Sequence, residues 1–275
     1  MAIELDFEEL PNSGIPSLYK FKSFDDKNYY KDLLNNFLWL SSRTELNDPF
    51  DAQIPMRYEL CTDSQIKQKM FDLLPINIPE EYRKRIVEQK FEERKKNPKF
   101  FENKLNEAID TTVGVCSFTK HLDNLLLWAH YAEKHSGFCL EYDAMKLNNN
   151  INEKFEKLEM RIFLLKVFYY SDFPIVNPCE HSMDEMYKMQ FLTKSKDWEY
   201  EDEWRILCLD GHKRKDKNEP IEPECITNIY FGLNASEDNI KISVDILNKS
   251  NPGIGFYKAQ KKKDAFGLEF EKLNF

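Results

Sequence analysis

The segment WEYEDEWRIL, which begins at Trp198, carries the densest set of side chains suited to chemistry. If it is a strand, alternate side chains share a face at a spacing of roughly 6.5–7 Å. Glu201, Glu203 and Arg205 then form one row, and Trp198 and Trp204 lie on the opposite face and suit burial. Two carboxylates on a rigid strand predict acid–base chemistry or stabilisation of a cation-like transition state. A solvated strand edge with an ordinary Glu–Arg pair explains the same pattern.

A turn and a helix supply further candidates. Asn47 and Asp48 precede Pro49 in a polar turn, where each of these residue types favours turn geometry. His130 and Tyr131 end a helix rich in Leu and Trp. For each of these four residues, the sequence is compatible with a purely structural role or with a place in a functional site.

Glu141 lies inside the apolar run FCLEY. A buried carboxylate needs a partner, and Arg205 or a lysine would provide one in a structural ion pair. A functional acid is the alternative.

The composition predicts a folded protein that does not depend on bulk positive charge. Of the 275 residues, 41% are apolar and 14% aromatic, and the net charge is −9. An acidic chain argues against nucleic-acid binding through bulk charge. The N-terminus has no basic start followed by an apolar run, and no stretch reaches the 18 apolar residues of a membrane span. We therefore expect a cytoplasmic protein that contacts no membrane.

The cysteines predict neither a disulfide framework nor a metal site. They are scattered and form no C-x-x-C pair, so we expect six reduced thiols that act as small hydrophobic residues, without zinc. The six are Cys61, Cys116, Cys139, Cys179, Cys208 and Cys225. Glycine-rich phosphate loops, nucleophile elbows and H-E-x-x-H motifs are also absent from the sequence.

Hydrophobic periodicity predicts an α+β fold, because strands and helices mix without regular βα alternation. Strands are expected at 17–23, 37–42, 112–118, 138–142, 198–209, 229–233, 254–259 and 266–270. Helices are expected at 25–36, from Asp123 or Asn124 to Tyr131 with Gly137 closing, at 184–194 and at 236–249. We expect one domain over 1–275, with a mixed, largely antiparallel sheet.

A helical insertion is predicted at about 62–110, where Pro75, Pro79 and Pro98 break the helical pattern. Nine basic and six acidic residues lie between Glu80 and Lys104. They form a solvated helical face, or alternatively a mobile lid or a weak phosphate-contacting patch.

Five blocks of the sequence resemble a known family. LYKFKSFD, LWLSSRTELNDPFD, VCSF, LLLWAHYAEKHSGFCLEYD and KDWEYEDEWRI match, in order, the blocks of the bacterial domain of unknown function 2971 family. The resemblance runs from about Leu18 to Asn234. The resemblance says little about activity or substrate, because the function of that family is unknown.

In outline the chain is also similar to ADP-ribosyltransferase folds, which carry a basic residue, a serine and a Glu-x-Glu on successive blocks. Those blocks would fall on Lys20 or Lys22, on Ser41 or Ser42, and on Glu201 and Glu203. The resemblance implies NAD as substrate, held in part by the basic residue. The last Glu would stabilise the oxocarbenium-like state, and the first would aim the acceptor. The chain departs from the family pattern in three places. Its first block has a lysine where the family has Arg or His, and its serine block lacks the usual Ser-Thr-Ser. Arg205 follows the two acids directly and could neutralise Glu203.

The resemblance implies an NAD-using ADP-ribosyltransferase-like enzyme or an NAD glycohydrolase, acting in bacterial antiviral defence or as a toxin. Its acceptor would be a protein or a nucleic acid. One alternative is a non-enzymatic module of such a system that binds a partner protein or RNA. Another is a hydrolase in which Asp48, Glu141 and the Glu201/Glu203 pair hold a divalent metal. The spacing of the acids does not favour that reading.

Overall fold

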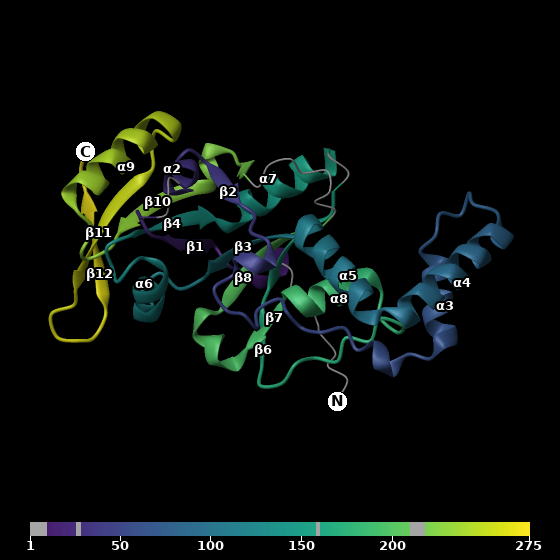
Figure 1. The fold of residues 1–275 in the computed structure, drawn as a ribbon. Coiled ribbons are helices and arrows are strands. Elements are labelled where there is room, and N and C mark those ends of the chain that lie inside the picture. The colour runs from purple at the N-terminus through teal and green to yellow at the C-terminus, as the bar shows by residue number, and fades with distance from the viewer. Residues whose placement is uncertain (1–9, 26–28, 158–159, 210–217) are drawn as a thin grey trace.

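The computed structural model describes residues 10–25, 29–157, 160–209 and 218–275 (Figure 1). A central sheet of eight strands dominates this part of the chain, and only the β10–β11 pair is parallel. Its strands, in spatial order, are β12 (Leu268–Leu273), β11 (Gly255–Lys261), β10 (Ile226–Phe231), β4 (Phe138–Asp143), β1 (Ser17–Lys22), β3 (Gly114–Thr119), β8 (Glu203–Cys208) and β5 (Ile162–Lys166). The predicted α+β class with a mixed, largely antiparallel sheet is confirmed.

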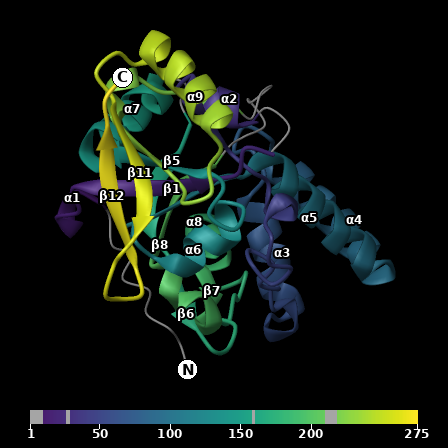
Figure 2. The same ribbon diagram turned by 90° about the vertical axis from the view of Figure 1, so that its left-hand side faces the viewer.

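Helices cover both faces of the sheet (Figures 1 and 2). The first face packs against α1 (Leu10–Ser13), α2 (Tyr29–Leu34), α7 (Ala144–Lys157) and α9 (Glu237–Ser250). The second face packs against α5 (Pro98–Thr112), α6 (Leu125–Tyr131) and α8 (Met183–Phe191). Side chains alternate between the two cores along each strand. On β1, for example, Leu18 enters the first core and Phe21 the second.

Short elements lie around the sheet. Two-stranded sheets pair β2 (Phe37–Trp39) with β9 (Asn218–Pro220) and β6 (Phe168–Tyr170) with β7 (Thr193–Ser195). The short 3-10 helices are η1 (Arg43–Glu45), η2 (Tyr58–Leu60), η3 (Lys196–Glu201) and η5 (Pro223–Cys225).

The sheet opens between β1 and β3. The two strands share a single residue pair, Tyr19 with Thr119, whereas β1 pairs with β4 over its whole length from Ser17 to Lys22. Beyond Tyr19 the two strands therefore separate.

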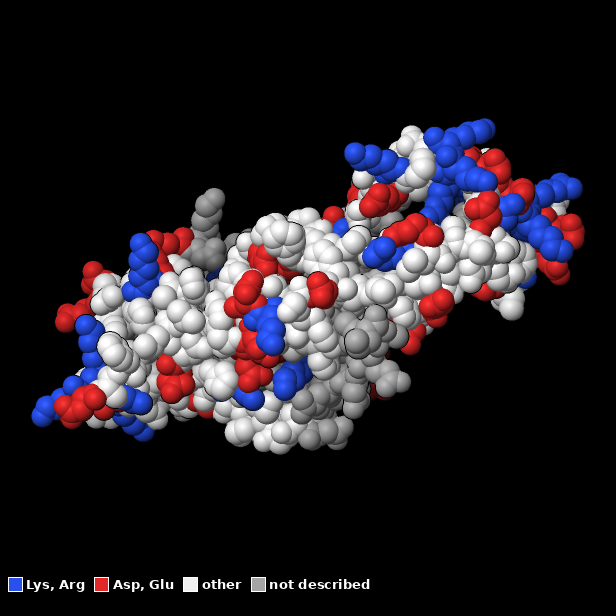
Figure 3. Space-filling view, turned by 90° about the horizontal axis from the view of Figure 1, so that it is seen from below, with Lys and Arg blue, Asp and Glu red and all other residues white. Residues whose placement is uncertain are grey.

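The predicted helical insertion corresponds to α3 (Asp63–Asp72), α4 (Glu80–Lys96) and α5. Pro98 begins α5, where a proline in the first turn loses no hydrogen bond. Helices α3 and α4 form an arm that projects away from the sheet (Figure 1). Lys and Arg side chains gather on this arm among acidic ones (Figure 3).

Most element predictions are confirmed, and the ends of two helices are corrected. Asn124 caps α6, accepting from the N–H groups of Leu126 and Leu127. Helix α8 ends at Phe191, three residues before the predicted end. Gly137 does not close α6, because the helix ends at Tyr131 with Ala132 as its C-cap. A Cβ at Gly137 would lie 2.1 Å from the Lys22 carbonyl oxygen, so this glycine instead permits a close backbone approach.

Residues 198–202 are not part of a strand, contrary to the sequence prediction. Residues Lys196–Glu201 form η3, and β8 begins only at Glu203. The polar run HKRKDKN at 212–218 predicts a loop between two strands, and all of it except Asn218 lies outside the described residues.

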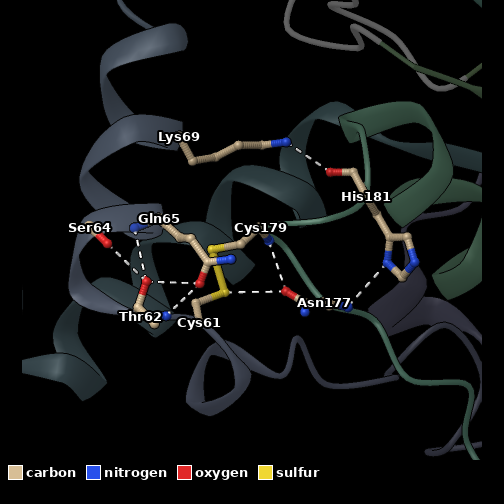
Figure 4. The surroundings of a disulfide bond; sticks show 8 residues. All are labelled: Cys61, Thr62, Ser64, Gln65, Lys69, Asn177, Cys179 and His181. Carbon is tan, nitrogen blue, oxygen red and sulfur yellow. Dashed lines mark hydrogen bonds between the residues drawn. A yellow bond between two sulfur atoms is a disulfide. The ribbon is translucent and has the colours of Figure 1, made fainter.

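The prediction of six free thiols is wrong for two cysteines. Cys61, at the start of the arm, forms a disulfide with Cys179 in the segment before α8 (Figure 4). The other four cysteines are buried free thiols. A span of 118 residues separates the bridged pair, which is why no local spacing signalled it.

Among the described residues, none of the helices has the length and apolar character needed to cross a membrane.

Candidate functional site

Glu201 and Glu203 lie on two different elements that meet at a sharp bend. Between the end of η3 and the start of β8, Asp202 adopts a left-handed conformation with φ 43°. Asp tolerates this conformation better than most residues. The bend brings both glutamates toward one lysine and replaces the predicted straight row. Both are buried, each with 4% exposure, so the expected solvated edge is absent.

Lys194 on β7 is the centre of this charge cluster. Its Nζ lies 2.6 Å from Glu201 Oε2, 3.1 Å from Glu203 Oε2 and 3.5 Å from Asp51 Oδ2. Strand β7 pairs in parallel with β6, where Lys194 lies opposite Tyr169. A single buried cation therefore serves three carboxylates.

Arg205 is the second cation of the cluster. Its Nη1 and Nη2 donate to the two carboxylate oxygens of Asp51 at 2.8 and 2.5 Å. Nε and Nη2 donate to Glu203 at 2.6 and 3.0 Å. The remaining capacity of Nη1 goes to the Phe191 carbonyl at the end of α8. Such two-pronged pairing fixes geometry and is stronger than a point contact.

Tyr131 connects α6 to the cluster. Its hydroxyl donates to Glu201 Oε1 at 2.6 Å, and Asn47 Nδ2 donates to that hydroxyl at 3.3 Å. The sequence candidates Asn47, Tyr131 and Glu201 thus form one hydrogen-bonded chain through the Tyr131 hydroxyl, although they are far apart in the sequence.

The pKa values of Glu201 and Glu203 are shifted in opposite directions. Burial raises the pKa of Glu201, and Lys194 only partly offsets this. Burial would also raise the pKa of Glu203, but Arg205 and Lys194 hold it well below its usual range. Burial acts to lower the pKa of Lys194, yet Glu203, Asp51 and Glu201 together raise it above the ordinary lysine value. The arrangement resembles sites in which neighbouring carboxylates are held in different protonation equilibria.

A pocket of about 240 Å³ opens over this cluster at the point where β1 and β3 separate. Charged, aromatic and polar groups line it, among them Tyr19, Lys20, Lys22, Asn47, Asp51, Ser117, Tyr131, Lys194, Glu201, Glu203 and Arg205. The candidates Lys20, Lys22, Asn47, Tyr131, Glu201, Glu203 and Arg205 therefore share one cavity.

Lys20 lies at the edge of the pocket. Its Nζ donates to the Ser117 carbonyl at 2.9 Å and lies over the Phe118 ring. The candidate serines are placed elsewhere. Ser41 lines a smaller neighbouring cavity together with Lys20 and Lys22, and Ser42 begins η1 as its N-cap.

Three other predicted side chains have local roles outside the pocket. Asp48 Oδ1 accepts from the Phe50 N–H at 2.9 Å, which is the turn contact expected from sequence. His130 is exposed and lies near the rings of Tyr131 and Trp198. The predicted placement of Trp198 opposite the charges is wrong, because its ring faces Lys194 Nζ at 5.0 Å.

Glu141 makes no ion pair with Arg205 or a lysine in the described part of the chain. Its oxygens accept from Ser17 Oγ at 2.6 Å, Asn228 Nδ2 at 2.6 Å and Tyr230 Oη at 2.7 Å. The expected partner is thus replaced by neutral donors on β1 and β10. Glu141 lies outside the residues that line the pocket.

Sequence reasoning missed Lys194 and Asp51. Lys194 was assigned to the end of a helix, and Asp51 closes the turn block NDPFD. Asp51 pairs with Arg205 across 154 residues, a separation that no spacing rule covers. The only signal in the sequence was Arg205 itself, which precedes the apolar residues of the strand. If Arg205 is buried, it requires a carboxylate partner.

No cluster of three or more His, Cys, Asp or Glu side chains in the described segments is arranged to hold a metal ion. The oxygens of Asp51, Glu201 and Glu203 are engaged by Lys194 and Arg205 instead.

The family model described as "Protein of unknown function (DUF2971)" matches residues 127–206. Over this stretch the chain is similar to the family whose blocks the sequence resembles, and the matched residues include Tyr131, Lys194, Glu201 and Glu203. No curated protein and no solved structure matches the chain.

Proposed function

We propose that the pocket over Glu201 and Glu203 binds the nicotinamide end of NAD and cleaves its bond to ribose. The product is either free ADP-ribose or ADP-ribose joined to a protein or nucleic-acid acceptor. The observation that carries this proposal is the buried cluster at the wall of the pocket, in which Lys194 and Arg205 pair with the three carboxylates Asp51, Glu201 and Glu203, so that the cluster itself holds one carboxylate more than it holds cations.

That extra carboxylate suits a cation-like transition state. When the C1′–N bond breaks, nicotinamide leaves as a neutral base and positive charge develops on the ribose. A preorganised carboxylate in a partly dry site stabilises such charge without reorganisation. Water or the acceptor then attacks C1′ and transfers its proton to a carboxylate.

Glu201 is the better choice for this role. Glu203 is engaged through both oxygens by Arg205 and also by Lys194. Among the described residues, Glu201 accepts from Tyr131 and Lys194 alone, and burial has raised its pKa toward the range useful for proton transfer. Glu203 then acts as a positioning residue that fixes the two cations.

The pocket dimensions suit only the reacting end of the dinucleotide. Its volume of about 240 Å³ is below the roughly 300–1,000 Å³ of a site that encloses a whole drug-sized ligand. The adenosine end would lie outside, and Lys20 and Lys22 at the edge are placed to meet the pyrophosphate.

The test is nicotinamide release from NAD, measured chromatographically with and without added protein and nucleic-acid acceptors. Glu201→Gln should lower the rate by roughly two orders of magnitude or more, the scale of one preorganised group. Glu199→Gln is the matched control, because Glu199 is exposed in the same turn and lines no part of the pocket. An unchanged rate in Glu201→Gln, or a wild-type protein that neither binds nor consumes NAD, would reject the proposal.

A second candidate function, binding of a partner protein or RNA without catalysis, is favoured by the projecting arm. Large apolar side chains are exposed on it, including Leu73 at 62%, Ile76 at 91% and Tyr82 at 61%. Single exposed apolar residues are common, but a group of them beside basic side chains is typical of interaction surfaces. Co-purification of RNA or protein with the wild type, lost in the triple variant Leu73→Ser, Ile76→Ser and Tyr82→Ser, would support this function.

A further inference from the structure

A second and larger cavity lies where α3, α4, α5 and α8 come together at the base of the arm. Its volume is about 530 Å³, within the range of small-molecule sites. The arm, α5, α8 and the chain from Gln53 to Glu59 all contribute to its wall. The lining residues are Arg43, Gln53, Ile54, Pro55, Met56, Tyr58, Glu59, Met70, Arg94, Pro98, Phe101, Glu102, Leu105, Asn106 and Gln190.

Much of this wall is apolar. Along α5 the lining positions include Phe101 and Leu105, which are four residues apart and therefore share one helix face. Met56 and Met70 add flexible thioether side chains to the wall, and Met adapts readily to the shape of a ligand. The cavity thus offers a surface that suits an aromatic or aliphatic body.

Arg94 on α4 is the polar anchor of the cavity. It is half-buried, and its guanidinium stacks on the Tyr58 ring with a Cζ-to-centroid distance of 4.0 Å. In the described part of the chain no carboxylate forms an ion pair with Arg94, although most arginines on such an acidic protein have that opportunity. A stacked, immobilised guanidinium without a counter-ion is preorganised for a planar anion.

The other charges in the wall limit the ligand to one negative charge. Arg43 is already held by Asp110 at 2.5 Å, and Glu59 is paired with Arg57. Glu102 is exposed at the cavity and raises the pKa of Tyr58, after the larger effect of burial and against Arg94. A dianion would meet the field of this glutamate, whereas a monoanion would be balanced by Arg94.

We propose that this cavity is a binding site for a small organic monoanion, a carboxylate with an apolar, preferably aromatic body. Its carboxylate pairs with Arg94, and its apolar part lies against Phe101, Leu105 and Met56. The site is distinct from the pocket over Glu201, with which it shares no lining residue.

The test uses three probes with one apolar body and different charge: 2-naphthoate, neutral 2-naphthalenemethanol and dianionic 2-naphthyl phosphate, each titrated calorimetrically. 2-Naphthoate should bind most tightly to the wild type. Arg94→Gln should weaken its binding roughly tenfold, about 1.4 kcal/mol, and leave the neutral probe unchanged. Arg85→Gln is the matched control, since Arg85 also lies over a tyrosine ring on α4 but does not line this cavity.

A second variant keeps the test decisive if Arg94→Gln proves poorly folded by circular dichroism. Glu102→Gln removes an exposed charge and should tighten binding of the naphthyl phosphate at least threefold, with a smaller effect on 2-naphthoate. The proposal is overturned if 2-naphthoate shows no saturable binding at millimolar concentration. It is equally overturned if Arg94→Gln and Arg85→Gln weaken binding alike, or if Glu102→Gln leaves the phosphate probe unaffected.

Discussion

Lys194 Nζ lies 2.6 Å from Glu201 Oε2, and this contact joins β7 to the bend that precedes β8. The lysine is 3% exposed at its side chain and also reaches Glu203 and Asp51. Because each carboxylate comes from a different element, one ammonium group holds three parts of the fold together. The same contact sets the charge of the proposed catalytic pocket.

Replacement of Lys194 by Met should destabilise the protein strongly. It removes the cation while leaving buried carboxylates close together, and breaking a buried pair in this way costs about 3–5 kcal/mol. Urea unfolding followed by tryptophan fluorescence measures the loss. Lys196→Met, at an exposed position two residues further along, should change the free energy of unfolding by less than about 0.5 kcal/mol. Equal effects of the two variants would contradict the buried cluster.

Glu201 and Glu203 should make the free energy of unfolding depend on pH in opposite ways. Burial alone would raise the pKa of Glu203, but Arg205 and Lys194 lower it below the unfolded value of about 4.3. A depressed pKa gives stability that is present above the unfolded value and is lost as the pH falls through the folded value. The free energy of unfolding should therefore fall below about pH 4.3, and Glu203→Gln should make this fall shallower.

The pKa of Glu201 is shifted in the opposite direction, so a variant at this position provides an internal control. Burial raises its pKa, so protonation on acidification relieves a cost and adds stability. Glu201→Gln removes that gain, and its acid-induced fall should be steeper than that of the wild type. Unfolding curves between pH 3 and 7 compare the three proteins. The assignment is wrong if both variants change the slope in the same direction.

Much of the fold was predictable from local patterns, but the site was predictable only in part. Alternation of apolar residues located β1, β4 and the core face of β8, since that signal is local and repeats every second residue. Asp202 in a left-handed conformation shifted Glu201 and Trp198 off the expected faces, and no periodicity reports such a bend. Asp51 reaches Arg205 from 154 residues away, so chain spacing holds no information about it.

Trp204 should prove essential to the first core. It is 1% exposed and packs there with Phe118 and Tyr142, as the alternation of β8 predicted. Trp204→Ala should lower the free energy of unfolding by about 3–5 kcal/mol. Trp204→Phe should cost much less, because the indole N–H has no hydrogen-bond partner in the described residues and its removal leaves no polar group unsatisfied. A large loss in both variants would indicate that the indole N–H is paired.

The disulfide between Cys61 and Cys179 should stabilise the attachment of the arm to the body. Its two ends are 118 residues apart, and a crosslink that closes so long a loop restricts the unfolded chain strongly. The double variant Cys61→Ser and Cys179→Ser should therefore lose about 2–4 kcal/mol in chemical denaturation. Cys225→Ser is a poor control because Cys225 is buried, so the comparison is the wild type unfolded with and without reductant.

Thiol titration of denatured, unreduced protein should find the four free cysteines, and reductant should expose all six. Six thiols before reduction, or equal stability with and without reductant, would show that the bridge does not hold the arm in solution.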